Sequence, residues 1–149
     1  MYFKRKELEK FRSFKGPLID VRSPGEYYKG HMPNSINIPL FDNEERSIIG
    51  TIYKKKGRKK AVIEGLKFLE KKIELLLNNL FMNIDSYKNI SGNHNKELFI
   101  RIYCSRGGMR SQSISWLLEK FKLKNLTLNG GYKIYRRSVL DSFSKKLNI

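Results

Sequence analysis

Residues 98–121, LFIRIYCSRGGMRSQSISWLLEKF, carry the most informative pattern in this sequence. It begins with an apolar run typical of a buried strand and ends with apolar residues at helical spacing. A cysteine, two adjacent glycines and two arginines lie between these parts. This order predicts a strand over residues 98–103, a loop that begins at Cys104, and a helix over residues 111–122.

Further elements are expected on both sides of this stretch. Leu18 to Arg22 is an apolar run that ends at a Ser-Pro-Gly turn, and residues 26–29 can form one helical turn. Residues 36–38 and 126–128 are short candidate strands, the second followed by a Gly-Gly turn into a last helix. Strand and helix therefore alternate, which predicts an α/β fold with a mainly parallel sheet flanked by helices on both faces.

Three other segments complete a single domain over residues 1–149. Apolar residues recur at spacings of three and four between positions 61 and 81, which predicts one long helix. Residues 82–97 are polar and rich in Asn, Ser and Gly, and are predicted to form a surface loop. Residues 1–16 mix charges with aromatic residues, so we expect an N-terminal arm or a short helix there.

Charge and cysteine content narrow the functional classes. The 31 Lys and Arg against 14 Asp and Glu leave a formal charge of +17, which attracts polyanions and favours nucleic acid as a partner over an anionic membrane surface. A lysine-biased proteome would produce the same composition. A single cysteine excludes an internal disulfide and a Cys-rich zinc site, and no apolar run reaches membrane-spanning length. We expect a cytoplasmic protein with no metal site and no membrane partner.

The loop after the predicted strand is the candidate active site. Its two glycines allow the backbone amides to point inward as an anion nest, and the following helix adds its positive end. Such a loop stabilises a thiolate, persulfide or perselenide, so Cys104 is the candidate nucleophile. The alternative is an ordinary buried thiol. The other candidate loop residues are Ser105, Arg106, Gly107, Gly108, Met109, Arg110 and Ser111.

The same spacing supports a rival activity. Cys104 and Arg110 are separated as in the phosphate-binding loop of cysteine phosphatases. A phosphatase also needs a general acid, for which Asp42 and Asp85 are candidates. This hypothesis predicts turnover of phosphate esters and a phosphorylated cysteine.

Several motifs in order resemble the rhodanese family over nearly the whole chain: Asp20-Val21-Arg22, Glu26, Gly30-His31-Met32-Pro33, Ile36-Asn37-Ile38-Pro39 and the Cys104 loop. The resemblance implies that Asp20, Arg22, Glu26 and His31 surround or support the active loop, although the same residues could form a buried ion-pair network. We expect His31 to bond its own turn rather than act in catalysis. Typical rhodanese loops are one residue shorter, so a generic thiosulfate sulfurtransferase stays as an alternative, and the longer loop has room for a larger anion.

A narrower set of residues is similar to the tRNA 2-selenouridine synthase family: Pro39-Leu40, Asn43, Glu45-Arg46, Gly50-Thr51, Tyr53-Lys54, Gly57, the Cys104 loop and Gly130-Gly131-Tyr132-Lys133. The resemblance implies that Cys104 is the essential cysteine. It also implies that wobble 2-thiouridine of tRNA exchanges sulfur for selenium from the co-substrate selenophosphate, through a geranylated intermediate. No tightly bound cofactor is expected.

The chain departs from that family in one respect. The family continues into a P-loop domain, and no G-x-x-x-x-G-K-[ST] motif is present here. The resemblance therefore implies a separate P-loop partner that binds geranyl diphosphate, with this chain as half of a split enzyme or a fragment of a longer one.

Two basic clusters are candidates for RNA contact, because lysines bind phosphates and tyrosines stack on unpaired bases. For each cluster the alternative is a solvated charged face. A third functional hypothesis is a non-catalytic RNA-docking module, for which Cys104 would be dispensable. The first cluster is Tyr53, Lys54, Lys55, Lys56, Arg58, Lys59 and Lys60, and the second is Tyr132, Lys133, Arg136 and Arg137.

Overall fold

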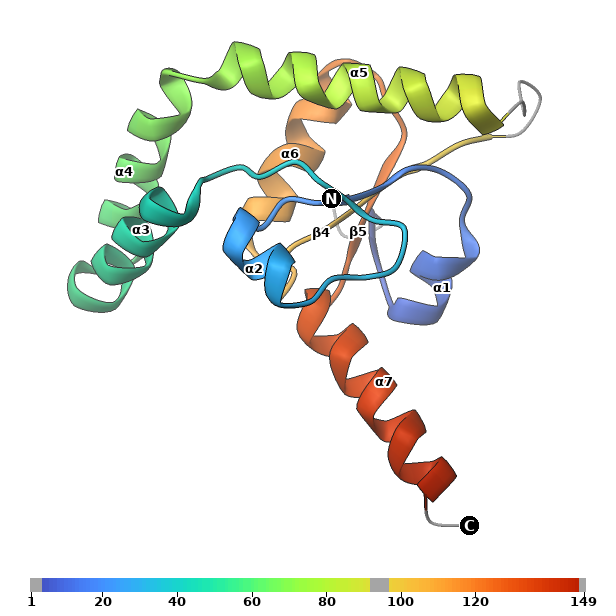
Figure 1. Cartoon of the computed structure of the whole chain (residues 1–149). Helices are drawn as coiled ribbons and strands as arrows, with labels where there is room; N and C mark the ends of the chain where they lie inside the picture. The colour runs from blue at the N-terminus through green and yellow to red at the C-terminus, as the bar shows by residue number, and fades with distance from the viewer. Residues whose placement is uncertain (1–3, 92–96, 148–149) are drawn as a thin grey trace.

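A computed structural model describes residues 4–91 and 97–147 (Figure 1). Its five strands form one sheet in the order β1-β5-β4-β2-β3, and every recorded pairing is parallel. The predicted α/β fold is confirmed. The strands are β1 (Arg5–Lys6), β2 (Leu18–Asp20), β3 (Ile36–Asn37), β4 (Ile100–Tyr103) and β5 (Asn125–Leu128).

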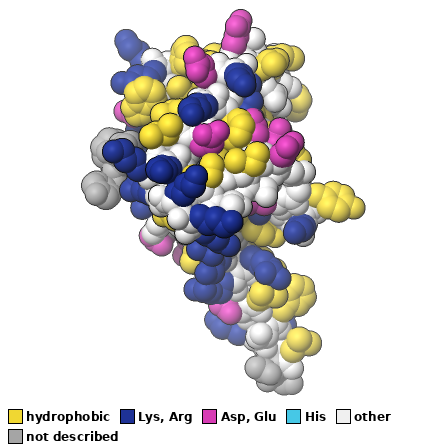
Figure 2. Space-filling model, turned by 90° about the vertical axis from the view of Figure 1, so that its left-hand side faces the viewer, with side chains coloured by type: hydrophobic (Ala, Val, Ile, Leu, Met, Phe, Trp, Pro, Cys, Tyr) yellow, Lys and Arg dark blue, Asp and Glu magenta, His cyan; other side chains and the backbone are white. Residues whose placement is uncertain are grey.

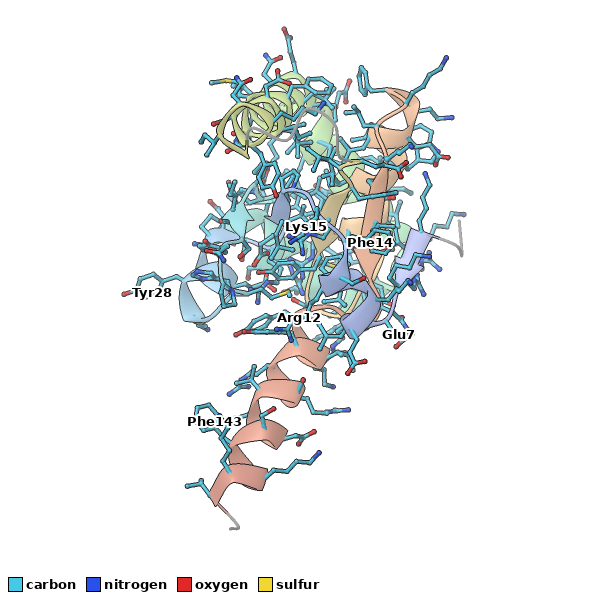
Figure 3. The ribbon with its side chains drawn as sticks, turned by 90° about the vertical axis from the view of Figure 1, so that its right-hand side faces the viewer. Glu7, Arg12, Phe14, Lys15, Tyr28 and Phe143 are labelled. Atoms are coloured by element: carbon cyan, nitrogen blue, oxygen red, sulfur yellow. The ribbon has the colours of Figure 1, made fainter. Side chains whose placement is uncertain are left out.

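The helices cover both faces of this sheet, as expected for a parallel sheet. Helices α5 and α6 lie on one face, and α1 with the beginning of α7 lies on the other. Most of α7 extends away from the body, with Phe143 pointing outward (Figure 3). The helices are α1 (Leu8–Ser13), α2 (Pro24–Lys29), α3 (Asn43–Lys56), α4 (Arg58–Glu70), α5 (Ile73–Ser91), α6 (Met109–Lys120) and α7 (Gly131–Leu147).

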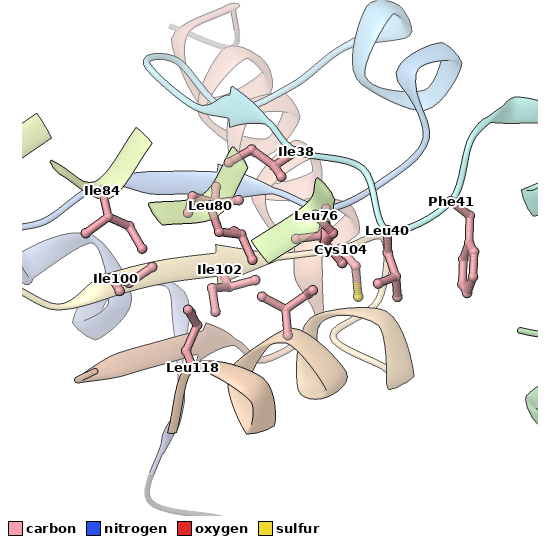
Figure 4. Close-up of a cluster of buried hydrophobic side chains, with 13 residues drawn as sticks. Ile38, Leu40, Phe41, Leu76, Leu80, Ile84, Ile100, Ile102, Cys104 and Leu118 are labelled. Atoms are coloured by element: carbon pink, nitrogen blue, oxygen red, sulfur yellow. The ribbon is translucent and has the colours of Figure 1, made fainter. Parts of the chain in front are cut away.

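The period of two along β4 assigns its residues to the two faces. Ile100 and Ile102 are buried against α5 and α6, together with Leu80 and Leu118 (Figure 4). Tyr103 points to the opposite face, where it is buried with the second core cluster around Phe11, Leu126 and Leu128. Cys104 continues the first row, so its side chain enters the α5 and α6 side of the sheet.

Two predictions for the middle of the chain are wrong. The apolar pattern of residues 61–81 spans two helices, because α4 ends at Glu70 and a tight turn at residues 71–72 redirects the chain into α5. The predicted loop over 82–97 is helical as far as Ser91, and residues 92–96 lie outside the described part. Leu80 and Ile84, one turn apart, are both buried on the sheet, and this tertiary contact holds a polar sequence in a helix.

Helices α3 and α4 form a hairpin on one side of the sheet (Figure 1). None of the sequence patterns above assigns an element to residues 43–56. A capping box starts α3, since the Asp42 carboxylate accepts from the Glu45 amide and the Glu45 carboxylate accepts from the Asp42 amide. Gly57, with φ of 90°, reverses the chain between the two helices.

The N-terminal prediction holds in part. The short helix is present as α1, and β1 adds an edge strand beside β5 that the sequence did not reveal. Residues 1–3 of the predicted arm lie outside the described residues. Among the described helices, none combines the length and apolarity needed to cross a membrane.

Candidate active site around Cys104

The site lies where the order of the strands reverses. From β2 the chain moves outward to β3, and from β4 it moves outward in the other direction to β5. Loops that leave the carboxyl ends of such neighbouring strands diverge and open a crevice between them, which is the usual ligand position in open α/β sheets. Cys104 directly follows β4 at this point.

The Cys104 thiol is held by the first turn of α6. Its side chain is 3% exposed, and Sγ donates to Ser111 Oγ at 3.2 Å. The Ser111 hydroxyl in turn donates to the Gly108 carbonyl at 3.3 Å. If the Ser111 hydroxyl rotates, it can donate to a thiolate at the same position. Ser111 can therefore form a hydrogen bond with Cys104 as a thiol or as a thiolate.

The loop backbone requires glycine at two contacts with the turn after β5. Gly107 has φ of 73°, and a Cβ there would lie 2.7 Å from the Leu128 carbonyl oxygen. Gly131 has φ of 59°, and a Cβ there would lie 2.4 Å from the Cys104 carbonyl oxygen. The Cys104 carbonyl accepts from the Tyr132 amide at 2.8 Å. Side chains larger than hydrogen would push the two turns apart.

The backbone amides of the Cys104 loop are free of hydrogen bonds to the rest of the described chain. Within the described part of the chain, the backbone N–H groups of residues 105–111 donate no recorded hydrogen bond. Unpaired amides at a loop and helix start are the donors from which anion nests are built. The loop can therefore accept an anionic ligand beside Cys104.

Glu26 braces the loop from α2. Its carboxylate accepts from Ser105 Oγ at 2.7 Å and from Arg110 Nη1 and Nη2 at 2.7 and 3.2 Å. Burial opposes ionisation of Glu26, but the hydrogen bonds from Arg110 and Ser105 outweigh it and hold its pKa well below the usual range. An ionised Glu26 therefore holds both ends of the loop.

This arrangement does not favour the phosphatase alternative. A phosphatase arginine must present its guanidinium to the phosphate, whereas both terminal nitrogens of Arg110 bond a carboxylate. The candidate general acid Asp42 caps α3, and Asp85 is exposed on α5. Neither has a recorded contact with the loop among the described residues.

Asp20 and Arg22 form a buried ion pair away from the thiol. Arg22 Nη2 lies 2.7 Å from Asp20 Oδ2 and donates to the Gly30 carbonyl at 2.7 Å. The guanidinium also covers the Tyr132 ring at 4.1 Å. Burial, reinforced by the negative charge of Asp20, raises the pKa of the neighbouring Tyr103 phenol. Asp20 and Arg22 thus hold together the turns around the site.

His31 bonds its own turn. Its Nδ1 lies 2.8 Å from the Tyr27 carbonyl oxygen, and its ring stacks on the Tyr27 ring at 3.6 Å. Its side chain is exposed, and no recorded hydrogen bond from His31 reaches the described loop residues. Among the described residues, this position gives His31 no recorded hydrogen bond with the Cys104 thiol.

The comparisons with known proteins agree with this geometry. Residues 4–138 match the family described as Rhodanese-like domain. The chain belongs to the rhodanese-like domain family. A crystal structure with TM-score 0.73 and 40% identity covers 91% of this chain and 98% of its own. It is the N-terminal domain of a Clostridium difficile 630 protein named for ATP/GTP binding.

Curated relatives of this rhodanese-like domain carry the name tRNA 2-selenouridine synthase. The Proteus mirabilis (strain HI4320) protein is 35% identical over 127 residues, which are 84% of this chain and 32% of the relative. The Sulfurovum sp. (strain NBC37-1) protein is 34% identical over 130 residues, 87% of this chain and 33% of the relative. The chain spans about a third of the length of these relatives.

The second basic cluster lies beside the Cys104 loop of the rhodanese-like domain. A groove of about 400 Å³ is lined by Ser105 and Arg106 of the loop and by residues of α7. The α7 residues are Tyr132, Lys133, Arg136, Arg137, Leu140 and Asp141. Figure 2 shows Lys and Arg side chains gathered over the middle of one face and along the upper part of α7. The structure thus joins a predicted RNA-contact cluster to the loop.

The first basic cluster lies at the far end of the α3–α4 hairpin. Tyr53, Lys54, Lys55 and Lys56 end α3, and Arg58, Lys59 and Lys60 begin α4. Every one of these side chains is exposed. They therefore form a solvated, positively charged tip.

Arg46, in the first turn of α3, is a site residue that the sequence did not single out. Its Nε lies 3.7 Å from Glu26 Oε1. Burial lowers the pKa of Arg46, and Arg110 acts in the same direction, while Glu26 and Cys104 raise it. Glu45-Arg46 belonged to the family resemblance, but nothing local in the sequence connects it with the distant Cys104 loop.

Proposed function

We propose that this rhodanese-like domain is the cysteine-bearing module of a tRNA 2-selenouridine synthase, with Cys104 as its nucleophile. The observation that carries the proposal is the position of Cys104, inside a loop of unused amides, next to Ser111 and braced by Glu26. The names of the relatives supply the reaction class.

In the proposed reaction, wobble 2-thiouridine exchanges its sulfur for selenium from selenophosphate through a geranylated intermediate. In this proposal the Cys104 thiolate attacks the phosphorus of selenophosphate at the crevice between β2 and β4, so that an S–P bond forms and the P–Se bond breaks. The released selenide displaces the geranylthio group from the uridine, and water then hydrolyses the S–P bond to restore the thiol and release phosphate. The amides of residues 105–111 hold the anionic selenium or phosphate group. No resident cofactor takes part in this half of the enzyme.

The remaining reaction steps need a second protein part. The chain spans about a third of its curated relatives, and its C. difficile structural relative is the N-terminal domain of a protein named for ATP/GTP binding. Both facts support a P-loop partner that supplies the rest of the synthase and binds geranyl diphosphate.

The tRNA is proposed to lie across the two basic clusters. The cluster beside the groove places Tyr132 and Arg136 next to the active loop, where a wobble nucleotide must arrive. The hairpin tip offers further phosphate contacts. Electrostatic contacts of this kind position the RNA without reading its sequence.

The test is mass analysis of wobble uridine in tRNA that contains 2-thiouridine, after incubation with selenophosphate, a geranyl donor and the P-loop partner. Wild type should form selenouridine, and Cys104→Ser should form none. Ser113→Ala, one turn into α6 with its hydroxyl bonded to the Met109 carbonyl of its own helix, is the matched control. Selenouridine formed by Cys104→Ser would replace the enzymatic proposal with the RNA-docking alternative.

A further inference from the structure

The three arginines around the Cys104 loop differ in what they already bind. Arg110 is bonded through both terminal nitrogens to Glu26. Arg106 is exposed and lines the groove beside α7. Arg46 makes no recorded side-chain hydrogen bond within the described part of the chain, although its Nε is buried. A buried N–H donor without a partner is rare in folded proteins.

The backbone that carries Arg46 is held in place. The Asn43 side-chain oxygen accepts from the Gly25 amide at 2.7 Å, which attaches the beginning of α3 to α2. Glu45 forms an ion pair with Lys72, which attaches α3 to the turn before α5. Arg46 is therefore presented to the site by a helix start fixed on two sides.

The sequence also leaves room for its guanidinium. A Cβ at Gly50, one turn along α3, would lie 2.8 Å from Arg46 Nη1. Gly50 has no positive φ that would call for glycine. The space it provides is occupied by the end of the Arg46 side chain, of which 38% stays exposed to solvent.

The charges around the loop are unbalanced. Arg46, Arg106 and Arg110 carry three positive charges, because guanidinium groups stay protonated in proteins. Arg46 and Arg110 both form ion pairs with the same carboxylate, Glu26, and the pair with Arg110 is the shorter one. An anion on the loop amides would meet the Arg46 guanidinium, whose Nε lies 3.7 Å from the shared Glu26 carboxylate and donates no hydrogen bond within the described residues.

We propose that Arg46, rather than Arg110, binds a phosphoryl oxygen of the ligand that sits on the Cys104 loop. Arg110 instead holds Glu26 and thereby the shape of the loop. The inference rests on the proposed function for the identity of the ligand, which is either the phosphoryl group of free selenophosphate or a backbone phosphate of the tRNA.

The experiment uses the single cysteine of the chain. The rate of Cys104 modification by methyl methanethiosulfonate is measured at increasing concentrations of inorganic phosphate and constant ionic strength. The decrease in rate yields an apparent Kd for phosphate. Arg46→Ala should raise that Kd about tenfold or more, because a charge-assisted hydrogen bond is lost. Gly50→Ala should weaken binding while keeping the charge, because it displaces the Arg46 guanidinium.

Arg12→Ala is the matched control, since Arg12 is exposed on α1 at the other face of the sheet (Figure 3). It removes the same charge and should keep the wild-type Kd. Thermal unfolding of each variant shows that the fold is intact.

A second arm replaces inorganic phosphate by an RNA stem-loop. Protection by inorganic phosphate that depends on Arg46 supports the free donor as ligand, and protection by the stem-loop alone, again dependent on Arg46, supports the tRNA backbone. Equal protection of wild type and Arg46→Ala, or no protection by either probe, overturns the inference. Selenouridine formation that still depends on Cys104 would leave the proposed function standing in that case.

Discussion

The Cys104 loop and the α3–α4 hairpin tip both carry basic side chains, but those of the tip are solvated whereas Arg110 of the loop is bonded to another helix. In the loop, Arg110 and Ser105 are bonded to Glu26 of another helix, and the thiol is 3% exposed. At the hairpin tip, lysines and Arg58 are exposed to solvent. A loop with fixed contacts suits a small anion in one geometry, whereas solvated charges suit a polyanion that can bind in several registers.

The largest stability effect is expected on the loop side, in the buried pair behind it. Asp20→Ala leaves the Arg22 guanidinium buried without its carboxylate, which should lower the free energy of unfolding by about 3–5 kcal/mol. Urea unfolding measures this loss. Asp85→Ala, an exposed aspartate on α5, should change stability by less than about 0.5 kcal/mol. An equal loss of unfolding free energy in the two variants would show that the buried Asp20–Arg22 ion pair contributes no more to stability than a solvated carboxylate.

Glu26→Gln should have the next largest effect. The amide keeps the shape of the side chain but loses the charge that Arg110 and Ser105 bond, at a cost of about 2 kcal/mol in unfolding free energy. Glu70→Gln, at the exposed end of α4, is the control. A Glu26→Gln protein as stable as wild type would mean that the loop holds its shape without this carboxylate.

The pH dependence of this contribution has a definite sign. The pKa of Glu26 is lower in the folded chain than in the unfolded one, so its stabilisation is complete above the unfolded value of about 4.3 and is lost as pH falls toward the folded value. The stability gap between wild type and Glu26→Gln should therefore stay constant above about pH 5 and shrink as pH falls from about 5 to about 3. Urea titrations across this range measure the gap, and a gap that widens toward low pH would contradict the assigned contacts.

The smallest effect on folding is expected at the hairpin tip. Replacement of Lys54, Lys55 and Lys56 by alanine should leave the free energy of unfolding within about 0.5 kcal/mol of wild type. Binding of tRNA should weaken, and its dependence on salt should become shallower by about 0.9 in log–log slope for each lost phosphate contact. Filter binding at several salt concentrations measures both quantities.

Three exposed lysines outside the two basic clusters, Lys15, Lys71 and Lys122, provide a charge-matched control. Their replacement lowers the net charge equally. If both triple variants lose the same affinity, the hairpin tip acts only through total charge and is not a contact surface.

Local signals in the sequence account for the fold class and for the loop itself. The β4 alternation, the adjacent glycines and the apolar spacing of α6 act within a few residues of each other, so they can be detected without the fold. Apolar spacing was misleading between residues 61 and 81, because it does not show where one helix ends and the next begins. Polar composition was misleading between residues 82 and 91, which are helical as the continuation of α5. The break at residues 71–72 depends on α4 packing against α3 while α5 packs against the sheet.

The amino-acid sequence alone identifies the residues that can perform chemistry: one cysteine in a glycine-rich loop, within a strongly basic chain. The pairing of the charges becomes visible only in the folded chain. Arg110 bonds Glu26 across most of the chain length, and Arg46 reaches the same carboxylate with no hydrogen bond from its buried Nε. Side-chain pairing depends on distances set by the parallel sheet and its crossover helices, and sequence separation carries no information about those distances.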